Sequence, residues 1–410
     1  MDRSTLLRRN ALFALFFLPG LGIASWVTRT PDVRDLLGAS TAEMGLVLFG
    51  LSVGSMIGVL SSGVLVARFG ARPVVAVGTL SVALSLVVIG GGAAMSQSLV
   101  VAAGLCLFGL GMGGGEIALN IEGADVERLL GRPIMPLLHG FFSLGTVAGA
   151  TAGIVFTAVD FSVVLHLLAG GVVTLVVLAA TVRHLPAGVG KQIRAPRAGA
   201  EPAAAPRAAV WKDRPLLLIG AIVLAMAFAE GAANDWLPLV MVDGHGFDAA
   251  LGSAVFAVFA ASMTVGRFAG GYFLRRYGRV TVMRASAVAG GLGLAAVIFA
   301  DHQVLAAAAV VLWGLGASLG FPVALSAAGD SDENAAARVS LVATVGYVAF
   351  LVGPPLLGLL GEHYGLRNAL IAVLVCVAAA ALLAPAVGTR TTAAAGVTSP
   401  TDRSAGPARR

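Results

Sequence analysis

Charge is scarce in this sequence, and apolar residues take its place. Of the 410 residues only 12% are charged, 58% are apolar, and the mean hydropathy is +0.92. A soluble fold of this length cannot hide so much apolar surface from water. A lipid bilayer accepts it, because a helix crosses the hydrocarbon core with about 20 largely uncharged residues. The composition therefore predicts an integral membrane protein.

Several functional motifs are also missing. The two cysteines, Cys106 and Cys376, lie inside apolar runs, and neither they nor the six histidines have metal-ligand or redox spacing. We find no nucleophile elbow and no phosphate loop. The net charge of +6 is not accompanied by an aromatic-basic module of the kind that binds nucleic acid. We therefore expect no enzyme, no cofactor, no metal site and no nucleic-acid partner.

Long apolar runs dominate what is present. The first run follows Arg3, Arg8 and Arg9 as in a signal peptide, but another apolar run follows it, so a first transmembrane helix is the simpler interpretation. Twelve spans are predicted, at residues 11–28, 44–67, 73–115 (two spans), 133–159, 161–182, 215–240, 249–273, 281–300, 303–329, 339–361 and 368–389.

The basic residues predict the orientation. With an N-terminus in the cytosol, twelve spans place nearly all of the 27 Lys and Arg on the cytoplasmic side. The exceptions are Arg29, Arg34, Arg267 and Arg367. This asymmetry follows the positive-inside rule. We expect a multi-pass protein of the cytoplasmic (inner) membrane, with both termini in the cytosol and working as a monomer.

The chain divides into two halves. Residues 184–214 are rich in Pro, Ala, Gly and basic residues, which is typical of a linker. We therefore predict a six-helix bundle at 1–183, a cytoplasmic linker at 184–214, a second six-helix bundle at 215–389 and a disordered cytoplasmic tail at 390–410. The fold class is an all-α integral membrane protein.

The two halves look like repeats of one another. Gly63, Arg68 and Gly70 recur as Gly271, Arg276 and Gly278, a shift of 208 residues. Duplicated halves around a midplane site are a recurring plan in secondary transporters. Glycines at four-residue spacing predict close helix contacts within the first half, at Gly50, Gly54 and Gly58 and at Gly145, Gly149 and Gly153.

Two loop segments carry a family resemblance. GVLVARFGAR (63–72) and GYFLRRYGR (271–279) resemble the loop signature of the major facilitator superfamily, in which an Asp-Arg pair follows a glycine and latches the cytoplasmic side. Here Ala67 and Arg275 occupy the acidic position, which puts the usual latch in doubt. Arg68 and Arg276 can still bind carbonyls at a helix C-terminus and are gate candidates.

Three further segments are similar to a bacterial subgroup of that superfamily. Residues 116–145, 230–236 and 266–268 resemble the YbjJ/MosC-like subgroup, which is related to fucose-type sugar permeases. The resemblance implies twelve helices in two pseudo-symmetric bundles, the major facilitator fold. It also implies proton symport, a solute route lined by the first and fourth helix of each half, and packing of span 5 against span 8.

Ionisable groups inside a span are costly and are functional candidates by default. Glu116 lies in span 4 after three glycines, and Asn120 shares its helix face. Glu230 and Asn234 repeat this spacing in span 7, at an expected depth in the outer half of the membrane. The glutamates are proton-coupling candidates and the asparagines are substrate-cavity candidates. The alternative for Glu116 is a structural carboxylate paired with an arginine.

A gate and two aromatic contacts complete the candidate site. Arg267 in span 8 and His139 in span 5 are expected at similar cytoplasmic-side depth. With Glu116 they form a hypothetical inner gate whose pairing changes as the cavity opens. Phe17 and Trp313 are further cavity candidates that could stack on a ligand, although lipid or core contact is the commoner use of such residues.

The sequence thus predicts secondary active transport of a small polar, sugar-like solute by alternating access, coupled to protons. Drug or metabolite export by proton antiport is the first alternative. It is weakened because the Gly-Pro pair of antiporters is absent from residues 145–153. A non-transporting membrane receptor is the second alternative, weakened because no soluble sensing domain accompanies the spans.

Overall fold

The computed structural model describes residues 3–131, 134–191, 213–330 and 335–388, and within these ranges the regular structure is entirely helical. The first half contains α1 (Arg3–Val27), α2 (Thr30–Leu37), α3 (Thr41–Phe69), α4 (Ala71–Ala94), α5 (Ser98–Leu130), α6 (Met135–Ala158) and α7 (Val163–Thr181). The second half contains α9 (Arg214–Leu239), α10 (Ala249–Phe299), α11 (Gln303–Ala317), α12 (Gly320–Ala328), α13 (Ala335–Tyr364) and α14 (Leu366–Leu383).

The helices make up the twelve predicted spans. Eleven helical segments of the described chain are long and apolar enough to cross a membrane. One of them, α10, has 51 residues and would be about 76 Å long if straight, more than twice the ~30 Å hydrocarbon core. Non-helical backbone at Gly278 divides α10 into two spans, while α11 and α12 together form one. The short helix α2, which lies outside the spans, was not predicted.

The turn after span 2 has the same backbone conformation as the turn after span 8. Gly70 has φ 88° and ψ 166°, and Gly278 has φ 76° and ψ 165°. A positive φ of this size favours glycine, which has no Cβ to clash. The predicted sequence repeat is therefore also a repeat of backbone geometry, and it explains why glycine occupies both positions.

Glycines let the helices of the first half approach closely, as predicted. A Cβ added at Gly54 of α3 would lie 1.9 Å from the carbonyl oxygen of Cys106 on α5. One added at Gly145 of α6 would lie 2.0 Å from the carbonyl oxygen of Phe17 on α1. Real side chains never come so close, so any larger residue would push these backbones apart.

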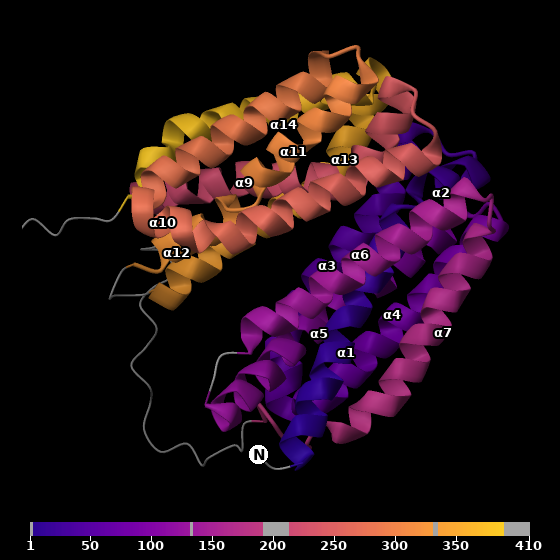
Figure 1. The fold of residues 1–410 in the computed structure, drawn as a ribbon, viewed down its shortest axis with the longest axis vertical. Helices are drawn as coiled ribbons and strands as arrows, with labels where there is room; N and C mark the ends of the chain where they lie inside the picture. Colours follow the sequence, from indigo (N-terminus) through magenta and orange to yellow (C-terminus); the bar gives the residue numbers. More distant parts are fainter. Residues whose placement is uncertain (1–2, 132–133, 192–212, 331–334, 389–410) are drawn as a thin grey trace, which may run out of the picture.

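The two halves meet at one end of the molecule and diverge toward the other (Figure 1). We call the end that carries α2 the α2 face, and the end at which α1 and α9 begin the linker face. Across the two halves α3 packs on α13 and α6 packs on α10. Gly45 and Gly358 bring the backbones of α3 and α13 into contact, because a Cβ on Gly45 would lie 3.0 Å from the Cα of Gly358. The halves are therefore closed at the α2 face and parted at the linker face.

A buried ion pair ties α1 to α5 near the linker face. Because Glu122 and Asp125 follow the apolar run of span 4 in the sequence, a solvated loop network is the simplest expectation for them, and for Glu122 this expectation is wrong. Its side chain is fully buried and pairs with Arg8 of α1, which also contacts Asp125 at 2.8 Å. The expectation failed because α5 continues to Leu130, well past the apolar run.

Candidate transport site

An ion pair joins α9 to α10 in the second half. Arg267 of α10 donates through Nη2 to Oε1 of Glu230 on α9 over 2.8 Å. The carboxylate side chain is 14% exposed and the guanidinium side chain is 48% exposed. The two residues were expected at different depths, and that expectation was wrong, because the ion pair puts their charged groups at one depth. Counting residues from helix ends ignores the tilt of each helix and the length of the arginine side chain.

The first half contributes two more titratable groups to this region. Glu116 on α5 and His139 on α6 are both exposed. The Arg267 guanidinium lies within electrostatic range of the Glu116 carboxylate and of the His139 ring. Arg267 therefore faces both members of the predicted inner gate across the boundary between the halves. The change in their pairing during transport stays a prediction.

Glu116 on α5 has no fixed partner in the described chain, a property that it shares with Asp235 on α9. No hydrogen bond or ion pair of the Glu116 carboxylate occurs among the described residues. The Tyr347 hydroxyl on α13, in the opposite half, lies within electrostatic range of it. Sequence reasoning missed Tyr347. The sequence did hold a signal, because Tyr347 is a phenol in the middle of an apolar run. In the structure it is half-buried, whereas the other three tyrosines are exposed.

The two candidate asparagines have different surroundings. Asn120 lies one turn from Glu116 on α5, and its Oδ1 is buried without a hydrogen-bond donor in the described part of the chain. Asn234 on α9 is half-buried. A buried carbonyl oxygen without a donor is an open acceptor. Asn120 is therefore the better placed of the two to bind a hydroxyl or an amine.

The aromatic candidates lie mainly in packed surroundings. Trp313 is fully buried, its indole Nε1 donates to the Ala229 carbonyl over 3.2 Å, and its ring packs edge-on against Phe259. It has no surface open to a ligand in this conformation, which agrees with the packing alternative. Phe17 is half-buried, and its backbone carbonyl touches α6 at Gly145.

The two loop-signature arginines lie at the parted face. Arg68 and Arg276 are exposed, and each covers the ring of its neighbour, Phe69 at 5.1 Å and Tyr277 at 5.9 Å. Neither takes part in an ion pair within the ranges that the structure describes. Their role as a gate stays a prediction, because a latch at this face would form only when the halves approach.

A cavity of about 510 Å³ opens beside the ion pair on the second half. It lies between α10 and α12, and Arg267 forms part of its wall. Its size falls in the range of small-molecule pockets. The other lining residues are Gly270, Gly271, Leu274, Arg279, Leu319, Phe321, Pro322, Val323 and Ser326.

Among the described residues, four polar contacts join the halves at the α2 face and along the helices that lead from it, and we call this set the seam. Two of them involve serine hydroxyls that donate to backbone carbonyls over 2.7 Å, Ser253 to Thr28 and Ser52 to Phe350. The others are a hydrogen bond from the Ala42 amide to the Glu362 carboxylate and an ion pair of Arg34 with Asp243. The seam closes the α2 face, so the central charged groups are reached from the linker face.

Two bundles of helices, closed over a central set of charged groups at one face and parted at the other, define a membrane-embedded transporter. The chain belongs to the Major Facilitator Superfamily, whose family model matches residues 134–354 and 271–408.

Curated relatives support this assignment. A transporter of Sinorhizobium fredii is 30% identical over 90% of this chain and 95% of its own length. An MFS-type transporter of Yersinia pestis is 29% identical, over 85% of this chain and 87% of its own. The membrane protein MosC of Rhizobium meliloti is 26% identical, over 88% and 85%. The resemblance to the MosC-like subgroup is thus confirmed.

Solved structures share the fold. The nucleoside transporter NupG aligns with a TM-score of 0.75 at 18% identity, over 93% of this chain and 98% of its own. A bacterial homologue of the lysosomal transporter Spinster, in an inward-facing and unoccupied conformation, aligns with a TM-score of 0.70 at 13% identity, over 94% and 98%. The fucose:proton symporter FucP of E. coli aligns with a TM-score of 0.63 at 16% identity, over 94% and 100%.

Proposed function

We propose that this protein is a proton-coupled symporter of a small polar, sugar-like solute in the cytoplasmic membrane. The linker face is then the cytoplasmic face, as the distribution of basic residues predicts, and the conformation described above opens toward the cytosol. Glu116 is the group that carries the proton, and the Glu230–Arg267 pair together with Asn120 binds the solute.

The observation that carries this proposal is the unpaired Glu116 carboxylate opposite Arg267. While the linker face is open, water can solvate the charge. When the halves close over it, an unpaired carboxylate loses that water at a cost of several kcal/mol. Closure therefore requires either a proton on Glu116 or a shift of Arg267 toward it. Protonation of Glu116 keeps Arg267 and Glu230 available to bind a solute. A shift of Arg267 toward Glu116 instead allows the empty carrier to close.

The chemistry of the site and two neighbours support a hydroxylated solute. Arginine, carboxylate and amide groups together offer donors and acceptors that match vicinal hydroxyls. Two structural neighbours are a nucleoside transporter and a fucose:proton symporter. Both of those solutes are small, polar and rich in hydroxyl groups.

Proton movement in proteoliposomes tests the proposal. Purified protein is reconstituted with a pH-sensitive dye in the lumen, and sugars, polyols, nucleosides and amphiphilic drugs are added outside. We expect one hydroxylated class to acidify the lumen with the wild-type protein and not with Glu116→Gln. The matched control is Asp301→Asn, because the Asp301 side chain is 94% exposed and far from the site in sequence and contacts.

Three results would contradict the proposal. Proton efflux driven by drugs rather than influx driven by solutes would identify an antiporting exporter. Solute uptake without any proton signal, or a full proton signal from Glu116→Gln, would remove Glu116 as the coupling group.

A further inference from the structure

Arg29 is a fully buried arginine at the α2 face, immediately before α2. Its exposed fraction is 1%, the lowest of any charged side chain apart from Glu122 in the described chain. Burying a guanidinium costs several kcal/mol unless its donors find acceptors. Nothing in the proposed proton coupling uses Arg29, so its burial calls for another explanation.

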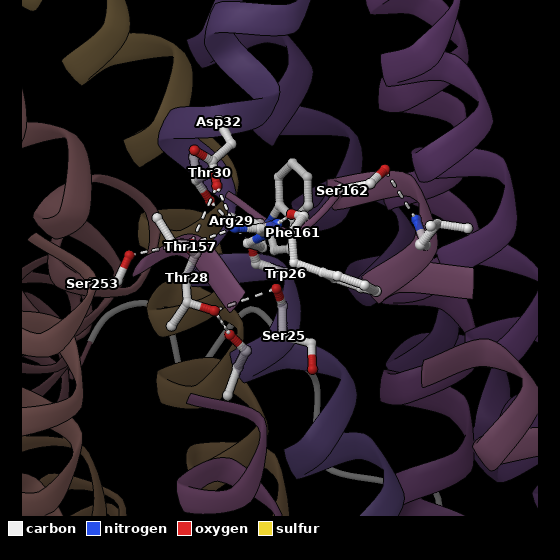
Figure 2. Close-up of polar contacts among 12 residues, drawn as sticks. Ser25, Trp26, Thr28, Arg29, Thr30, Asp32, Thr157, Phe161, Ser162 and Ser253 are labelled. Atoms are coloured by element: carbon white, nitrogen blue, oxygen red, sulfur yellow. Dashed lines mark hydrogen bonds and ion pairs between the residues drawn. The ribbon is translucent and has the colours of Figure 1, made fainter. Parts of the chain in front are cut away.

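The guanidinium holds three segments of the first half together (Figure 2). Nη1 donates to the Thr157 hydroxyl at the end of α6 and pairs with Asp32 of α2 at 2.9 Å. Nη2 donates to the carbonyl of Phe161, between α6 and α7. The Thr157 hydroxyl in turn donates to Asp32 over 3.3 Å. Arg29 therefore fixes the end of α1 against α2, α6 and the loop that follows α6.

The segments held in this way carry part of the seam. Thr28, the neighbour of Arg29, accepts the hydrogen bond from Ser253 of the opposite half through its backbone carbonyl. Ser253 is fully buried, so this bond is shielded from water. Helix α2, which Arg29 holds through Asp32, carries Arg34, the partner of Asp243. Two of the four seam contacts thus start from segments that Arg29 orients.

We propose that Arg29 is a positioning residue of the transport cycle, which stabilises the closed α2 face by holding the Thr28 carbonyl and α2 in the geometry that the opposite half binds. Arg29 touches no residue of the opposite half among its hydrogen bonds and ion pairs, and it acts through Thr28 and Asp32. The proposal is independent of the solute and of the coupling ion.

Only an arginine fits this role. Its planar fork reaches a hydroxyl, a carbonyl and a carboxylate at the same time, whereas a lysine is a single point charge. Burial lowers the pKa of Arg29 and raises the pKa of Asp32, because removal from water disfavours the charged form of each side chain. The two terminal nitrogens have acceptors in Asp32, Thr157 and Phe161, whereas Nε is buried without one in the described chain. The pair therefore depends on the hydrogen bonds to Thr157 and Phe161, and loss of either should open the network.

Distances between spin labels test this proposal in the full chain. Labels are attached to cysteines introduced at Met95 and His302 across the α2 face, and in a second protein at Phe69 and Tyr277 across the linker face. These four side chains are exposed, and Cys106 and Cys376 are first replaced by serine. We expect Arg29→Met to lower the ratio of closed to open α2 face about tenfold, because the variant loses the hydrogen bonds that the charged guanidinium donates. The linker-face distance should shorten in parallel.

Arg367→Met is the matched control. Arg367 lies at the same face and donates to the Ile298 and Ala300 carbonyls, all within the second half. Its loss should lower the melting temperature and leave both distance distributions unchanged. Arg29→Lys should restore part of the closed population, because it keeps the charge beside Asp32.

A double-mutant cycle with Ser253→Ala separates positioning from general destabilisation. If Arg29 acts through Thr28, the double variant opens the α2 face little more than the stronger single variant. Wild-type distances in Arg29→Met, or fully additive effects in the cycle, would overturn the proposal. If Arg29→Met does not fold, Arg29→Lys and Thr157→Val are judged by the same distances, and unchanged distances in both would likewise refute it.

Discussion

The two Glu-x-x-x-Asn motifs share a spacing and differ in every contact. On α5, Glu116 is exposed and has no ion pair in the described chain, and Asn120 has a buried oxygen without a donor. On α9, Glu230 is mostly buried and bonded to Arg267. The spacing places the acid and the amide on one helix face, but the neighbouring helix decides whether the acid is paired. An unpaired acid can take up and release a proton, whereas a paired acid holds two helices in a fixed arrangement.

The largest contrast is expected between the two glutamine substitutions. Glu116→Gln should abolish solute-driven acidification and keep solute exchange within about twofold, because exchange needs no net proton transfer. Glu230→Gln should lower both at least tenfold, because it leaves the Arg267 charge uncompensated in the site. Counterflow of labelled solute measures exchange, and the lumen dye measures coupling. Equal losses of exchange and of acidification in the two variants would show that the two motifs do not differ in function.

Removing the arginine tests the paired side of the comparison. Arg267→Met should destabilise the protein by about 1–2 kcal/mol, less than a fully buried pair would lose, because the guanidinium is half exposed. Adding Glu230→Gln should recover most of that loss, since no unpaired charge then remains. Thermal unfolding in detergent measures both variants. A double variant no more stable than Arg267→Met would mean that the ion pair contributes little.

The asparagines extend the comparison to the solute. Asn120→Ala should raise the KM for the transported solute about fivefold, the effect of one lost hydrogen bond of ~1 kcal/mol. Asn234→Ala, on the paired helix, should change KM less than about twofold. Initial uptake rates over a range of solute concentrations give both values. A larger effect at Asn234 would indicate that the solute binds nearer to the α2 face.

The smallest effect concerns the buried His245 ring, whose hydrogen-bond partner in the described part of the chain is a backbone carbonyl. The His245 Nε2 lies 2.9 Å from the Val297 carbonyl, and burial lowers the pKa of the ring. At about pH 6.5 and below, the unfolded chain binds a proton on this ring and the folded protein does not. The contribution of the neutral ring to the free energy of unfolding is therefore present above that pH and is lost as the pH falls. The melting temperature of His245→Gln should fall less than that of wild type between about pH 8 and pH 5.5. Parallel curves would contradict this account.

Much of the fold is visible in the sequence because it follows from local rules. Apolar run length gives the spans, and the asymmetry of basic residues supports their number. The repeated glycine after spans 2 and 8 predicts a repeated turn, which Gly70 and Gly278 adopt. Glycines spaced by four residues, such as Gly54, mark close helix contacts.

The pairing of side chains is not local, and there the sequence was a poor guide. Residue counts placed Glu230 and Arg267 at different depths, but helix tilt and a long side chain bring them together. Trp313 was a ligand candidate by residue type, yet a hydrogen bond to the Ala229 carbonyl holds it inside the bundle. The sequence showed Arg29 only as a basic residue outside the cytoplasmic side, because two of its three acceptors, Thr157 and Phe161, lie more than 100 positions away.

The seam has an evolutionary consequence. In three of its four contacts one partner is a backbone group, the carbonyls of Thr28 and Phe350 and the amide of Ala42. Main-chain atoms are present whatever the residue, so drift at those positions leaves the bond intact, and no compensating change is selected in the other half. Only Arg34 and Asp243 form a contact of two side chains. Among relatives, covariation across the α2 face should therefore concentrate at that one pair.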